Sequence, residues 1–224
     1  MRAFPAISRS LIATVMAGLT ITASSEAAII VIDPLNVSSS SEIPGFDRKD
    51  DYIVDGSGLS GGRHNNGANG EAWLSTGTGY GGDDLEPWVI FDLGDTYTIN
   101  SFQVWNYNEN ATGVQVLRGV NAVTVEYGTT LIGGDTVGGL SGTVAGITNF
   151  AIADGTSTYT GEVFNTFTAF NARYIKLDIN SNHGGDNNFY GLSEVQFDGV
   201  LVPEASSIAL LSLGGIGLLL RRRR

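Results

Sequence analysis

The chain has 224 residues, of which 31 are Gly and none is Cys, and its formal net charge is −11. The absence of Cys excludes a disulfide scaffold, a thiol nucleophile and a thiolate metal site, and the acidic balance argues against a nucleic-acid partner, which needs a basic surface. Frequent Gly without a three-residue period is typical of turns between short strands rather than of collagen.

The charge is unevenly distributed along the chain. Residues 28–202 hold six of the 12 basic and 21 of the 23 acidic residues, which gives this segment a net charge of −15. The other basic residues lie in the two apolar ends. We therefore expect one folded domain at 28–202 between two separate terminal segments, 1–27 and 203–224.

The first 27 residues have the pattern of a secretory signal peptide. Arg2 and Arg9 precede or flank an apolar run at 11–23, and the small residues Ser25 and Ala27 stand at the −3 and −1 positions of a cleavage site. A retained anchor helix is the alternative, but a membrane span needs about 20 apolar residues. We expect a signal helix that is cleaved, so that the mature chain starts near Ala28.

The body alternates short apolar runs with clusters of Gly, Asn, Asp and Ser. Strands are predicted at 29–33, 88–93, 99–105, 122–127, 162–164, 174–179 and 192–197. Several have the period of two that half-buried strands show; Val123, Val125 and Tyr127, for example, share one face. Residues 56–82 are expected to form an extended loop, interrupted at 72–75. Seven or more strands without helices predict an all-β sandwich or jelly roll.

The six residues that leave the strand at 99–105 have the chemistry of a sugar site. Sugar rings need an aromatic plate and polar groups for their hydroxyls, and Trp105, Tyr107, Asn108 and Glu109 supply both. Alternation puts both rings on the face opposite Phe102. Polar or aromatic residues of other loops that could converge on the same end are Arg118, His183 and Asn187, together with His64, Asn188 and Tyr190. The alternative is that Trp105 packs into the second sheet or under a loop, as large aromatics usually do.

The sequence ends with a three-part pattern. Pro203, Glu204 and Ala205 are followed by an uncharged apolar run at 206–220 and then by Arg221, Arg222, Arg223 and Arg224. A helix this short spans a bilayer only if the bilayer thins or the arginines snorkel. Basic residues stay on the cytoplasmic side, so the body should face outward.

This tail resembles the PEP-CTERM sorting signal of Gram-negative, exopolysaccharide-producing bacteria, with Ala205 in place of the family's second proline. The resemblance implies an exosortase as partner and an exported protein that is held transiently in the inner membrane and then sorted to the cell surface or extracellular matrix. An ordinary C-terminal anchor is the alternative, and it also places the body outside the cytoplasm.

The body resembles the discoidin superfamily, also called coagulation factor 5/8 type C or galactose-binding-like domains, which includes many bacterial carbohydrate-binding modules. The segments that carry the resemblance lie in the family's order at 54–56, 73–75, 88–94, 99–107, 118–120, 172–177 and 191–197. It implies an eight-stranded jelly roll whose ligand site lies on loops at one end.

The same resemblance implies a structural Ca²⁺ held by Asp55 and Glu194. Carboxylates and the backbone carbonyls of Gly-rich turns are ligands that Ca²⁺ prefers. Glu71 stands where the family has Thr. The alternative is that Asp55 caps an Asp-Gly turn and Glu194 is a solvated strand residue.

Enzyme motifs are weak in this chain. Ser60 lies in a G-x-S-x-G match at 58–62, but that motif works on a strand-to-helix turn of an α/β sheet, and no helical pattern follows it. His64 and His183 form no zinc motif. The sequence therefore favours a non-enzymatic, exported protein that binds extracellular polysaccharide or glycan or is associated with the matrix. A structural surface protein without a sugar ligand and an extracellular hydrolase are the alternatives.

Overall fold

The computed structural model describes residues 26–184 and 188–203. Within these ranges the regular structure consists of strands and three short 3₁₀ helices, η1 (Pro34–Asn36), η2 (Asp50–Ile53) and η3 (Gln115–Arg118). The strands are β1 (Ala28–Ile29), β2 (Val37–Ser39), β3 (Leu59–Ser60), β4 (Arg63–His64), β5 (Trp73–Leu74), β6 (Trp88–Asn106), β7 (Val123–Gly128), β8 (Thr130–Ile132), β9 (Thr136–Gly138), β10 (Gly142–Thr143), β11 (Glu162–Phe164), β12 (Phe170–Ile179) and β13 (Gly191–Leu201).

The expected signal helix and C-terminal membrane helix lie outside the described residues. In the part of the chain that the structure describes, no helix is long and apolar enough to cross a bilayer.

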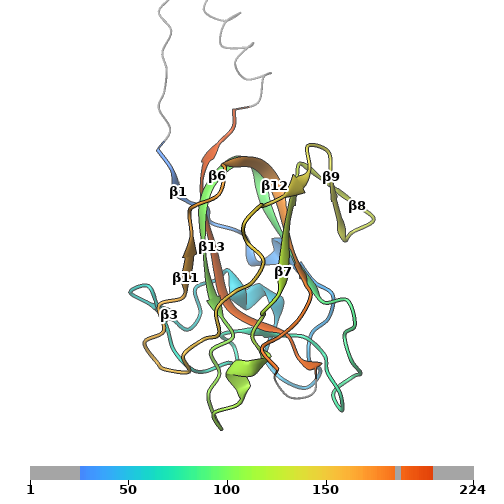
Figure 1. Cartoon of the computed structure of the whole chain (residues 1–224), viewed down its shortest axis with the longest axis vertical. Coiled ribbons are helices and arrows are strands. Elements are labelled where there is room, and N and C mark those ends of the chain that lie inside the picture. Colours follow the sequence, from blue (N-terminus) through green and yellow to red (C-terminus); the bar gives the residue numbers. More distant parts are fainter. Residues whose placement is uncertain (1–25, 185–187, 204–224) are drawn as a thin grey trace, which may run out of the picture.

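Strand β6 joins the two layers of the sandwich (Figure 1). Its first part pairs with β2 and β12, with Val89 opposite Leu177, and its last part pairs with β11 and β13, with Val104 opposite Val195. Strands β7 and β10 extend the first layer, and β1 and β5 extend the second. The all-β sandwich predicted from the sequence is confirmed.

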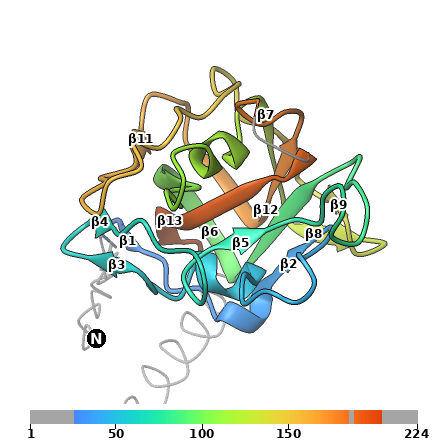
Figure 2. The same cartoon turned by 90° about the horizontal axis from the view of Figure 1, so that it is seen from below.

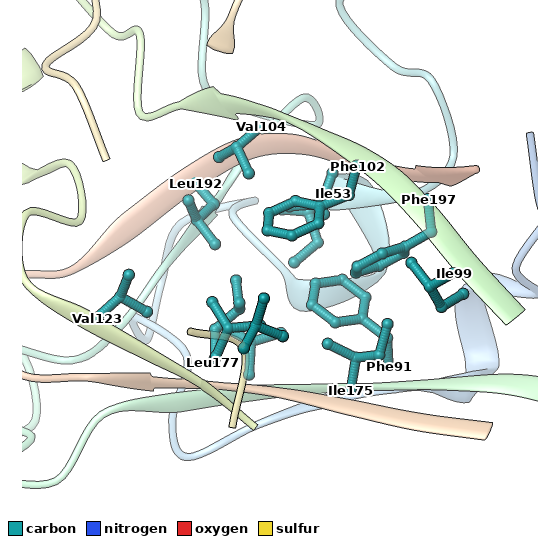
Figure 3. Packing of buried hydrophobic residues seen from close by; sticks show 14 of the residues in the cluster. Ile53, Phe91, Ile99, Phe102, Val104, Val123, Ile175, Leu177, Leu192 and Phe197 are labelled. Carbon is teal, nitrogen blue, oxygen red and sulfur yellow. The ribbon is translucent and has the colours of Figure 1, made fainter. Parts of the chain in front are cut away.

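The core lies between the layers, where side chains of period two point toward one another. Figure 3 shows Phe102, Val104, Leu192 and Phe197 from one layer facing Phe91, Val123, Ile175 and Leu177 from the other. The rings of Phe91 and Phe197 meet edge to face at 5.1 Å between centroids. Burying each such side chain contributes about 1.5–3 kcal/mol.

Two predicted strands, 88–93 and 99–105, are one strand of 19 residues. The sequence predicts two strands because Gly94 and its polar neighbours interrupt the apolar pattern between them. In the structure Gly94 has φ +82°, and the Asp92 carboxylate accepts a hydrogen bond from its backbone N–H. The guanidinium of Arg173, at a bulge in β12, donates two more to the same carboxylate, at 2.8 and 2.9 Å. These bonds hold the polar turn within the sheet.

The expected loop at 56–82 contains β5, which lies in the predicted interruption at 72–75 and pairs with β13, and also the β3–β4 hairpin, which was not predicted.

The two ends of the described chain leave the sandwich together, at the end that carries the β8–β9 hairpin (Figure 1). Strand β6 turns over at this end, where Tyr97 pairs with Leu201. Its own first and last residues, Trp88 and Asn106, therefore lie at the opposite end, which is formed by long loops (Figure 2). We call this the loop end.

Candidate functional site

Trp105, near the end of β6, and Tyr107, directly after the strand, both lie outside the main core cluster, as alternation predicts, but both rings are buried. Trp105 is 1% exposed and packs with Ala153 and Tyr159, and Tyr107 is fully buried in a second small cluster with Leu74 and its neighbours. Neither ring has a free face for a sugar. The prediction that these two residues contact a ligand is therefore wrong, because the loops that fold over them were invisible in the sequence pattern.

Asn108 is also buried, and its side chain holds two loops together. Its amide N–H groups donate to the carbonyls of Asn65 and Thr156, at 2.8 and 2.7 Å, and its amide oxygen accepts a 2.9 Å bond from Gly155. A side chain whose donors and acceptor are all used has little left for a ligand. Asn108 is thus a scaffold residue of the loop end and not the predicted sugar contact.

The structure brings the two predicted ligand residues Glu109 and Arg118 together with Arg48, which was not predicted as a site residue. Glu109 accepts a 2.7 Å bond from Arg48 and a 3.5 Å bond from Arg118, and the three side chains are only 9–14% exposed. The Tyr107 hydroxyl donates to the same carboxylate at 2.7 Å. Burial, and then the charge of Glu109, raise the pKa of Tyr107, so this hydroxyl stays a donor. We call these three charged residues the Arg–Glu–Arg cluster.

An open cavity of about 380 Å³ lies beside this cluster at the loop end. Its lining combines polar and apolar atoms in similar amounts and comes from three loops: Arg48, Asn66, Gly67, Ala68, Asn69, Glu71, Glu109, Asn110 and Ala111. The Arg48 Nε donates to the Asn69 amide oxygen at 3.2 Å, which fixes the guanidinium against the wall. The cavity therefore offers guanidinium, carboxylate and amide groups in fixed positions.

Two half-exposed aromatic rings stand next to the cluster. Phe46 and Tyr80 are each 42% exposed and meet edge to face at 5.6 Å. The Arg48 guanidinium lies 5.2 Å from the ring centre of Phe46, and Tyr80 lies 5.8 Å from Phe189. Arg118 lies 4.9 Å from that same Phe189 ring. The aromatic pair, Phe46 and Tyr80, is thus connected at both ends to the Arg–Glu–Arg cluster.

Sequence reasoning missed Arg48, Phe46 and Tyr80 because they lie in loops without periodicity. The one available signal was the run of Phe46, Asp47 and Arg48 after a Pro-Gly turn, which puts an aromatic ring near a guanidinium.

His183 lies beside η3, and it is not among the residues that line the cavity. Its backbone N–H donates to the carbonyls of Leu117 and Gly119. Burial lowers the pKa of its imidazole, so the ring is held neutral at pH 7. Asn187 lies outside the described residues.

The two residues expected to hold Ca²⁺ lie on neighbouring segments. Glu194 is buried, accepts weak bonds from the Gly56 N–H at 3.3 Å and from Gln196 at 3.4 Å, and forms no ion pair with a described basic residue. Burial raises its pKa to about 8 despite those bonds, and the charge of Asp55 adds to the effect. Glu194 is therefore not the solvated strand residue of the alternative interpretation.

Asp55 is exposed, and its carboxylate accepts a 2.7 Å bond from Ser57, as a turn cap does. Across the described ranges, no three His, Cys, Asp or Glu side chains gather into a metal-binding group. A Ca²⁺ at this place would take the two carboxylates, Asp55 and Glu194, and backbone carbonyls of the adjacent turn. The donor types fit Ca²⁺, and a buried carboxylate without a cationic partner is the kind of group that a cation stabilises.

Comparisons with known proteins identify the sorting motif and the fold. Residues 201–224 match the family model of the PEP-CTERM protein-sorting motif. A search of curated proteins finds no match. Among solved structures, a putative chitobiase fragment from Bacteroides thetaiotaomicron is 18% identical, with a TM-score of 0.52 over 82% of this chain and 99% of that one.

Two further structures show the same fold. A SusE-like protein is 16% identical, with a TM-score of 0.53 over 80% of this chain and 68% of that one. A fucolectin from striped bass (Morone saxatilis) serum is 16% identical, with a TM-score of 0.51 over 80% of this chain and 51% of that one. The chain thus carries a PEP-CTERM sorting motif at its C-terminus, behind a β-sandwich of the discoidin-like fold.

Proposed function

We propose that this protein is a surface-sorted, non-enzymatic carbohydrate-binding protein whose ligand site is the loop-end cavity with its aromatic pair. The observation that carries the proposal is the Arg–Glu–Arg cluster, which lies next to both the cavity and two exposed rings. Sugar hydroxyls both donate and accept hydrogen bonds, and guanidinium, carboxylate and amide groups serve them on both sides. Phe46 and Tyr80 would cover the apolar face of a sugar ring.

The charges around the cavity favour an uncharged glycan. Arg48 and Arg118 are balanced by Glu71 and Glu109, and the domain as a whole has a net charge of −15. A polyanion would be repelled by this surface at low ionic strength. An acidic polysaccharide is therefore the less suitable ligand class.

A structural Ca²⁺ held by Asp55 and Glu194 is the second part of the proposal. When bound, the ion would compensate the buried carboxylate and tie the turn at 54–57 to β13. Asp55 and Glu194 do not line the loop-end cavity. The ion would therefore stabilise the domain rather than contact the sugar.

The absence of catalysis remains a proposal, supported by the surroundings of the G-x-S-x-G match. Ser60 lies in the β3–β4 hairpin, opposite Arg63, and not on a strand-to-helix turn. Both ring nitrogens of His64 face backbone carbonyls, those of Ser57 and Asn65, at 3.1 and 2.8 Å. Neither nitrogen is free to act as the base of a serine nucleophile. Turnover of a glycan that Ser60→Ala abolishes would instead establish the hydrolase.

The test is a binding screen of the domain without its transport signals, residues 28–202, against neutral and acidic polysaccharides, with and without Ca²⁺. Binding to at least one neutral polysaccharide supports the proposal. No binding under either condition, combined with capture of another surface protein, would favour the structural alternative.

A further inference from the structure

A second cavity, of about 360 Å³, lies at the opposite end of the sandwich, where the chain leaves the domain. We call it the exit cavity. Its lining comes from the turn of β6, both flanks of the β8–β9 hairpin, the bulge of β12 and the last two described residues. The lining residues are Gly94, Asp95, Thr96, Thr129, Leu140, Asn171, Arg173, Val202 and Pro203, and none of them belongs to the loop end. It belongs to no part of the glycan site.

The sorting motif begins inside the folded domain, without a linker. The family match starts at residue 201, and Leu201 is the last residue of β13, paired with Tyr97. The backbone N–H of Val202 then donates to the carbonyl of Thr96 at 2.9 Å, and Pro203 itself lines the exit cavity. Any protein that engages Pro203 and Glu204 must therefore approach within contact distance of this surface.

The rim of the exit cavity carries an exposed apolar side chain, Leu140, whose backbone is held by a hydrogen bond. Leu140 is 74% exposed, and its backbone N–H donates to the Thr129 hydroxyl at 3.1 Å. Ile132 and Leu201, near the same end, are also exposed. Arg173, which also lines the cavity, is held by its paired bonds to Asp92. Exposed apolar side chains with polar groups around them are what a protein partner buries at the centre of an interface.

Shape and charge favour a protein over a lipid surface as the partner. The site is concave, whereas a bilayer presents a flat surface. It also contains the carboxylate of Asp95 and belongs to a domain of net charge −15, so anionic headgroups would be repelled. The sorting motif itself brings one particular protein to this place, the enzyme that processes the tail.

We propose that the surface around the exit cavity is a docking site for the exosortase that processes this tail, with Leu140 as its main apolar contact. Substrate recognition then includes the folded end of the sandwich as well as the linear motif. This proposal rests on the sorting motif and is independent of glycan binding.

The experiment follows conversion of the full chain to its shorter form in cells that contain the exosortase. Leu140→Asp is expected to slow conversion at least about 10-fold. The matched control, Leu85→Asp, changes a leucine that is 84% exposed and far from the exit cavity, and it should leave the rate unchanged. Equal rates for both variants would overturn the proposal. Thermal unfolding of both variants verifies that they fold.

A second variant separates docking from simple obstruction. Six Gly and Ser residues inserted between Val202 and Pro203 move the motif away from the exit cavity. Docking predicts slower processing, whereas a faster or unchanged rate would overturn the proposal. If Leu140→Asp instead reduces the membrane-bound fraction of the chain in cells without the enzyme, the surface contacts the bilayer and the proposal is wrong.

Discussion

The Glu109 carboxylate accepts a 2.7 Å hydrogen bond from Arg48, a residue 61 positions earlier in the chain, and this bond ties together two loops of the same cavity. Arg118, from η3, approaches the same carboxylate at 3.5 Å. Buried charges are stable only when paired, so each member of the cluster depends on the others. The site is therefore rigid before any ligand arrives, which lowers the entropic cost of binding.

Replacing Glu109 by Gln should destabilise the domain by about 3 kcal/mol, because it leaves two buried guanidinium groups without their carboxylate. Urea denaturation measures this change in the free energy of unfolding. Asp178→Asn is the control, since it breaks only the 3.4 Å surface pair with Lys176 and should cost less than about 1 kcal/mol. Equal effects of the two substitutions would show that the cluster is not a stabilising unit.

Trp105→Ala and Tyr107→Ala should each lower the free energy of unfolding by about 3–5 kcal/mol, as truncation of buried aromatic rings does. Phe46→Ala and Tyr80→Ala remove half-exposed rings and should cost no more than about 1 kcal/mol. Thermal unfolding of the four variants tests this difference. A stable Trp105→Ala variant that has lost only its sugar affinity would contradict the burial of that ring.

The stability of the Ca²⁺-free domain should depend on the titration of Glu194. Its pKa is raised from 4.5 to about 8 in the folded state, so the folded domain binds more protons than the unfolded chain between these values. The contribution of this group to stability is full below about pH 4.5 and is lost as the pH rises through about 8. Glu194→Gln should flatten this part of the stability profile measured in EDTA. An unchanged profile would assign the pH dependence to other groups.

Addition of Ca²⁺ at pH 8.5 should raise the melting temperature of the parent domain and not that of Glu194→Gln. At about 100 times its dissociation constant, a ligand of the folded state adds about 2.7 kcal/mol. Glu126→Gln, on strand β7, is the control and should keep the response to Ca²⁺. A response that survives in Glu194→Gln would place the ion elsewhere.

The sequence predicted those parts of the fold that rest on periodicity. Strand β11 has the predicted bounds, and β7, β12 and β13 contain or overlap the predicted runs, because alternating side chains report which face of a strand is buried. The tail was also recognisable, because its motif is continuous in the sequence.

The site was less accessible to prediction because it depends on loop conformation. Alternation placed Trp105 on the correct face of β6, but the loops that bury it carry no periodic signal. Glu109 and Arg118 were selected for their chemistry, and the structure does bring them together. The contact between Arg48 and Glu109 could not be predicted, since it spans 61 residues and arises only when the loops fold.

The most direct test of the central claim is calorimetric titration of the parent domain and of Tyr80→Ala with the neutral polysaccharide that binds best in the screen. Val163→Ala, an exposed side chain on β11 outside the cavity, is the control. The account predicts that Tyr80→Ala weakens binding at least about 10-fold, or about 1.4 kcal/mol, with a melting temperature close to that of the parent, while Val163→Ala binds normally. Unchanged affinity in Tyr80→Ala, or no affinity of the parent domain for any polysaccharide, would contradict it.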